Sequence, residues 1–71
     1  MRTRRLTRII REGGYLAEVD VQVMEIEGSW SAVMSLEDAQ ILDEVREALR
    51  QGDVQRAARL ARVFTIAPIA I

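Results

Sequence analysis

The sequence predicts an α+β fold in one small domain, residues 1–71. Apolar and polar residues alternate from Tyr15 to Val23, which is the period of a strand with one buried face. Apolar residues recur at spacings of three and four from Leu36 to Leu49, which is the period of a helix. We therefore expect a three-stranded antiparallel sheet, then a helical hairpin and a C-terminal strand. That last strand would join the sheet of its own chain or be exchanged between subunits.

The first two strands are predicted to form a hairpin. Residues 3–10 fit both a helical stripe and a strand, because they combine spaced apolar residues with β-branched ones. The clear alternation after Tyr15 favours a strand, since Gly13-Gly14 supplies the positive φ of a tight turn. After Val23 the alternation shifts by one residue, which a β-bulge near Val23–Met24 or a strong twist would accommodate.

The remaining elements follow from turn and cap residues. Gly28-Ser29 predicts a turn, and Trp30 to Met34 a short third strand. Ser35 is a good helix N-cap with Asp38 at the N3 position, and Gly52 ends that helix. Asp53 is expected to cap a second helix, whose inward-facing residues are Val54, Ala57, Leu60 and Ala61.

The C-terminal segment is predicted to be a strand from Phe64 to Ile66. Pro68 cannot donate to a ladder, so this part of the chain is expected at a sheet edge. The eight residues from Phe64 to Ile71 carry no charge and should pack on their own domain or on a neighbour.

The composition argues against an enzyme. The chain has no Cys or His, and all ten of its basic residues are Arg. It therefore offers no thiolate, no imidazole base and no disulfide, and we expect no catalytic residues, metal site or cofactor. The longest apolar run is eight residues, too short to span a membrane, and the basic N-terminus lacks a secretory pattern. We expect a cytoplasmic protein.

Self-association is the default expectation for a chain of this size. A domain of 71 residues without disulfides or metals seldom builds a sufficient core alone. We expect a dimer or tetramer. The predicted interface residues are Tyr15, Trp30, Phe64, Ile66, Pro68, Ile69 and Ile71.

The charges lie in blocks, although the net charge is only −1. Residues 1–11 carry five Arg and no acid, and residues 12–27 carry five acids and no Arg. This pattern suits strands or subunits of opposite sign lying side by side. The N-terminal arginines could form a nucleic-acid arm, but protection of an exposed edge strand is the favoured interpretation.

A second basic group is a candidate for anion or nucleic-acid contact. Arg56, Arg59 and Arg62 recur at every third position after Gly52, as on the recognition helix of a helix-turn-helix. A solvated helix face is the favoured interpretation, and nucleic acid is not the expected partner.

Two stretches carry resemblances to known families. Glu44 to Arg62 resembles one helical hairpin of a tetratricopeptide-type repeat. The whole chain resembles a family of short uncharacterised bacterial proteins, through Arg11-Glu12-Gly13, Tyr15 to Val19, Trp30-Ser31, Ser35 to Ala39 and Arg62-Val63. Its strands followed by a helix are also similar to antitoxins of the HicB type, which commonly continue into a DNA-binding segment that this sequence lacks.

These observations support three hypotheses. The first is a small homo-oligomeric protein-interaction module with no catalytic activity of its own. The second is an antitoxin-like regulator that binds a protein partner, and DNA through its Arg face. The third is a ligand pocket or weak active site at a subunit boundary, built from carboxylates and Arg.

Overall fold

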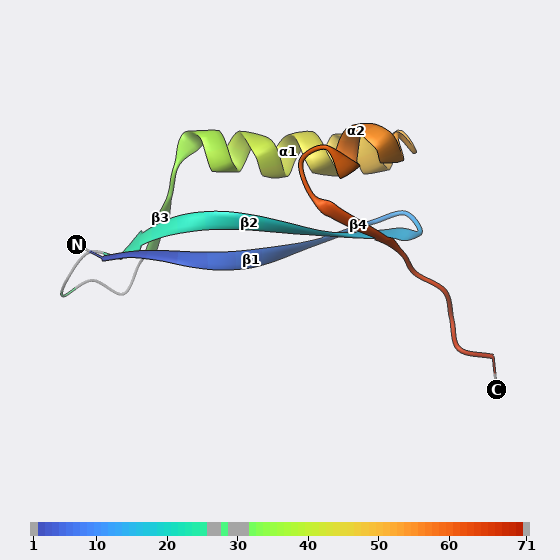
Figure 1. Cartoon of the computed structure of the whole chain (residues 1–71), viewed down its shortest axis with the longest axis horizontal. Coiled ribbons are helices and arrows are strands. Elements are labelled where there is room, and N and C mark those ends of the chain that lie inside the picture. The colour runs from blue at the N-terminus through green and yellow to red at the C-terminus, as the bar shows by residue number, and fades with distance from the viewer. Residues whose placement is uncertain (1, 26–27, 29–31, 71) are drawn as a thin grey trace.

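The computed structural model describes residues 2–25, 28 and 32–70. It has the predicted α+β class: an antiparallel sheet is covered on one face by two helices (Figure 1). No helix in these residues is long and apolar enough to cross a bilayer.

A long hairpin forms the base of the sheet. Strand β1 (Arg2–Glu12) pairs antiparallel with β2 (Tyr15–Glu25) along their whole length. Gly13 has φ 60° in the two-residue turn between them, as the Gly-Gly pair predicts. Residues 3–10 are therefore strand.

The predicted bulge at Val23–Met24 is wrong. The register runs without interruption from Glu12↔Tyr15 to Arg2↔Glu25. Val23 is buried on the helix side, and Met24 stands 42% exposed on the other face. The prediction assumed that apolar Met24 must reach the buried face, but the sheet leaves it on the uncovered one.

The second edge of β2 is shared by two short strands. Strand β3 (Ala32–Met34) pairs with Val23–Glu25, and β4 (Arg62–Thr65) pairs with Tyr15–Glu18. In this single chain the C-terminal strand therefore lies beside β2. Trp30, expected at the start of the third strand, lies outside the described residues.

The start of the first helix fills the gap between β3 and β4. Helix α1 (Leu36–Arg50) is capped as predicted, because the Asp38 N–H donates to Ser35 Oγ at 3.1 Å. The Asp38 carboxylate accepts a 2.8 Å hydrogen bond from the Gln22 N–H. This bond satisfies a backbone donor of β2 where no described strand reaches it.

The second helix is shorter than predicted. Helix α2 (Val54–Ala58) is capped by Asp53 and follows Gly52 at φ 75°. Ala57 is fully buried, but Leu60 is exposed. The helix ends early because the chain must turn within three residues to start β4 at Arg62.

The core lies between the helices and one face of the sheet. Its side chains are small to medium, and the residues are Ile10, Ala17, Val19, Val21, Val45, Ala48, Leu49 and Ala57. Leu36, predicted to begin the buried stripe of α1, is 72% exposed. No described helix covers the other face of the sheet, which we call the open face (Figure 1). The Cα radius of gyration is 14.4 Å, against about 11 Å for a compact domain of this length.

Candidate interaction surface

The open face carries apolar side chains toward both ends and an ion-paired cluster in the middle. Side chains alternate along each strand, so residues of β2 that neighbour the buried valines point to the open face. On β2 these residues are Leu16, Glu18, Asp20, Gln22 and Met24. Their cross-strand partners come from β1, β3 and β4.

One apolar end lies beside the hairpin turn. Leu16 faces Phe64 across the β2–β4 pair, and Ile9 is the diagonal neighbour of Leu16 on β1. Ile66 follows on the same face, held by its N–H, which donates to the Gly14 carbonyl at 2.9 Å. Ile9 is 56% exposed and Phe64 49% exposed. We call Ile9, Leu16, Phe64 and Ile66 the hairpin-end patch.

The chain continues from this patch as an apolar tail, residues 67–70. The tail runs away from the sheet on the side opposite the helices (Figure 1). Each of its residues is exposed, and Ile69 is 87% exposed. The hairpin-end patch and the tail follow one another at this end of the open face, and the patch is bordered by Arg11, opposite Leu16, and by Glu18, opposite Ile9.

The centre of the open face is an ion-paired cluster around Arg62. Its guanidinium donates to both Asp20 carboxylate oxygens, at 3.0 and 3.1 Å, and to Glu18 Oε1 at 3.1 Å. Thr7 Oγ1 donates to Asp20 Oδ1 at 2.9 Å. The hydrogen bonds from Arg62, then that from Thr7, lower the pKa of Asp20 from 3.8 to about 2. Asp20 and then Glu18 in turn raise the pKa of Arg62.

The three arginines proposed to contact an anion are dispersed. Arg56 bonds Glu44 Oε1 at 2.8 Å, which raises the pKa of Arg56, and it bonds Gln51 at 3.3 Å. Arg62 lies on the open face, whereas Arg59 is exposed at the end of α2 without an ion pair among the described residues. Two of the three are therefore already matched with acids of the same chain.

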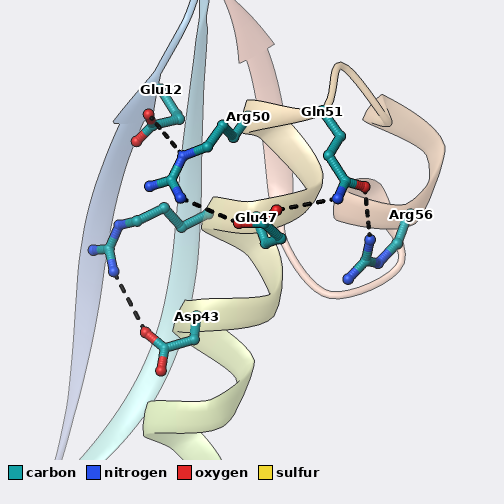
Figure 2. Close-up of polar contacts among 7 residues, drawn as sticks. Glu12, Asp43, Glu47, Arg50, Gln51 and Arg56 are labelled. Carbon is teal, nitrogen blue, oxygen red and sulfur yellow. Dashed lines mark hydrogen bonds and ion pairs between the residues drawn. The ribbon is translucent and has the colours of Figure 1, made fainter.

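Figure 2 shows that Arg56 belongs to a chain of polar contacts at the end of α1. Arg50 links Glu12 of β1 to Glu47, and Gln51 links Glu47 to Arg56. These groups are mostly exposed, so they orient one another rather than create a strong field. The carboxylates of α1 thus pair largely with neighbouring cations and amides.

A shallow hollow of about 490 Å³ lies beside the gap between β3 and β4. Its polar lining includes Arg5, Asp20, Glu37 and Asp38. Asp38 is engaged by the Gln22 N–H and Asp20 by Arg62. No group of three or more acids in the described residues could hold a metal ion. The second apolar end adjoins this hollow, where Met24 and Val33 are paired and exposed.

The predicted interface residues fall in different places. Phe64 and Ile66 lie in the hairpin-end patch, and Pro68 and Ile69 in the tail. Tyr15 is half-buried against the core on the helix side, so it is not part of the open face. Trp30 and Ile71 lie outside the described residues.

Sequence reasoning missed Ile9 and Leu16 as surface residues. The signal was the Ile9-Ile10 doublet: in a strand, adjacent residues point to opposite faces, so one of the two had to be on the open face.

In comparisons with protein-family models, curated proteins and solved structures, no match was found.

Proposed function

We propose that the chain is a homo-oligomeric interaction module, and that two copies meet through the hairpin-end patch and the tail. The observation that carries this proposal is the row of apolar side chains that runs from Leu16 through Phe64 and Ile66 to the tail, with exposed Ile9 diagonal to Leu16. Apolar patches of this kind on small proteins commonly mark interaction sites. Burial of each large side chain would contribute about 1.5–3 kcal/mol.

A second copy is the occupant that fits this surface best. The patch and the tail are themselves uncharged, and the side chains that border the patch, Arg11 and Glu18, are of opposite sign. A two-fold axis would place the tail of each chain on the patch of the other, as in an isologous interface. The helix-side core, whose largest fully buried side chains are valines, is small, and self-association adds the buried apolar area that it lacks.

The proposed module has no catalytic activity of its own and works in the cytoplasm of a bacterium. A regulator that binds nucleic acid through Arg56, Arg59 and Arg62 has weaker support, because two of these arginines already pair with carboxylates. A ligand site built from carboxylates and Arg also has weaker support, since Asp38 and Asp20 in the lining of the hollow are already engaged by the Gln22 N–H and by Arg62.

The test compares the oligomeric state of four proteins by sedimentation velocity over a dilution series. These are the natural chain, a chain ending at Ile66, Phe64→Ser, and Leu36→Ser as the control. Leu36 is as apolar and more exposed, but it lies at the start of α1. We expect truncation and Phe64→Ser to weaken association by at least about tenfold, and Leu36→Ser to leave it unchanged.

Equal association of all four proteins would overturn the proposal, and so would a natural chain that stays monomeric. Circular dichroism of each variant establishes that it remains folded.

A further inference from the structure

The outer edge of β1 lies on the side of the sheet away from β4 and has no partner strand among the described residues. The sheet order is β1-β2-β3 with β4 also on β2, so no described strand pairs with the outer side of β1. This edge is eleven residues long, without Pro, Gly or a bulge. Such an edge is a ready template for another strand.

The hydrogen-bonding direction of β1 follows from its neighbour. The Gln22 N–H points to Asp38, away from β1, and the Gly14 carbonyl accepts from Ile66 on the same side. Odd-numbered residues of β2 therefore bond to β1, and their partners there are even-numbered, as in Leu6↔Val21. The outward N–H and C=O groups of β1 belong to Thr3, Arg5, Thr7, Ile9 and Arg11.

The outer edge of β1 is strongly basic, which favours an acidic partner. The strand carries five Arg and one Glu. Arg4 pairs with Glu25 at 3.0 Å and Glu12 with Arg50 at 3.6 Å. Among the described residues, none forms an ion pair with Arg5, Arg8 or Arg11. A second copy of β1 would bring two strongly basic strands together, so like-charge repulsion opposes self-pairing.

The strand that pairs with β1 inside the sheet, β2, is acidic. It carries Glu18, Asp20 and Glu25 opposite or diagonal to basic and hydroxyl side chains of β1. Nucleic acid is less favoured, because β1 has no aromatic side chain for base stacking. We propose that the outer edge of β1 binds an acidic, extended segment of another protein by strand addition.

The spacing of the arginines defines this segment further. Arg5 and Arg11 point to the open face and Arg8 to the helix side, because residues three apart in a strand lie on opposite faces. In an antiparallel strand, the residues opposite these three are also three apart. The fitting segment carries Asp or Glu at every third position, with the middle acid on the other face from its neighbours.

The experiment uses labelled synthetic peptides rich in Thr and Val and the natural chain. One peptide has Glu at every third position. A second has the same composition with Glu at every second position, which places all acids on one face. Fluorescence anisotropy at low salt should show at least about tenfold tighter binding of the first peptide. Equal binding of both peptides would overturn the proposal.

Two further readouts separate strand addition from simple attraction of charge. Amide hydrogen exchange should show protection at Thr3, Arg5, Thr7, Ile9 and Arg11 when the first peptide is bound, with little change at even-numbered residues. N-methylation of that peptide at alternate residues on its bonding edge should abolish binding. Uniform protection, tolerance of N-methylation, or displacement by a short oligothymidylate at equal charge concentration would each contradict the proposal.

Two protein variants complete the design. Arg8→Ala should weaken binding of the first peptide, and Arg59→Ala, which removes the same charge at the end of α2, should not. The chain ending at Ile66 should bind the peptide as the natural chain does, because β4 and β1 lie on opposite edges of the sheet. Failure of self-association and failure of peptide binding are thus distinguished. Equal weakening by Arg8→Ala and Arg59→Ala would mean that only net charge matters.

Discussion

The two faces of the sheet differ in how deeply their side chains are buried. On the helix side, β2 presents Ala17, Val19 and Val21, which are almost fully buried under α1. On the open face, the alternate residues of the same strands leave Ile9 and Met24 about half exposed. The helix-side face forms the core, whereas the open face is the one that we propose for a partner, so the same substitution should have different consequences on the two faces.

The largest expected effect comes from a charge placed on each face. Val19→Asp puts a carboxylate into the core without a partner, which should cost about 4 kcal/mol or more and unfold so small a domain. Ile9→Asp leaves its carboxylate in water and should keep the fold. Circular dichroism and urea unfolding measure both, and a folded Val19→Asp protein would break the distinction between the faces.

Truncation of large side chains should show the same contrast at smaller amplitude. Leu49→Ala creates a cavity beneath α1 and should lower the free energy of unfolding by about 3 kcal/mol. Phe64→Ala, measured at a dilution where the chain is monomeric, should change it by less than about 1 kcal/mol. Equal losses in urea denaturation would mean that Phe64 is part of the folding core.

Asp38 and Ser35, at the start of α1, should contribute an intermediate amount to the free energy of unfolding. Asp38→Ala removes the acceptor for the Gln22 N–H and a charge at the start of α1, so we expect a loss of about 1–2 kcal/mol. Ser35→Ala removes only the cap and should cost about 1 kcal/mol. Amide exchange at Gln22 should accelerate in the first variant, and an unchanged rate would mean that this bond is not formed in solution.

The smallest effect concerns the charged centre of the open face. Because the pKa of Asp20 falls from 3.8 to about 2 on folding, its stabilising contribution is present above pH 3.8 and is lost as the pH falls toward 2. Asp20→Asn should flatten the acid limb of the stability profile between these values. In Arg62→Ala, NMR titration should show the pKa of Asp20 moving back toward 3.8. An unmoved pKa would show that Arg62 is not its main partner.

Much of this fold could be predicted because its signals are local. The alternation of β2, the Gly13 turn, the Ser35 and Asp53 caps and the Gly52 stop each act within a few residues of sequence. The predicted bulge is wrong because it depended on a feature that is not local. The sequence pattern shows that Met24 is apolar, but it does not show that no described helix covers the face of the sheet on which Met24 lies.

The proposed interaction surface was harder to predict, because it depends on pairing between residues far apart in the sequence. Ile9, Leu16 and Phe64 become neighbours only when β4 pairs with the first half of β2. The same pairing places Arg62 in β4, where it bonds Asp20, and not on the second helix. The three arginines that the spacing grouped on one helix face are therefore separated. Tyr15 differs from Phe64 in burial because alternation places it on the helix side.

In the proposed assembly the open face, and not the helix side, is covered when copies of the chain meet. A soluble paramagnetic probe reports the accessibility of individual side chains by NMR, and the measurement is repeated over a dilution series of the protein. We expect that Ile9 and Phe64 become protected as the protein concentration rises, whereas Leu36 stays accessible throughout. Unchanged accessibility of Ile9 and Phe64 at every concentration, or equal protection of Leu36, would contradict it.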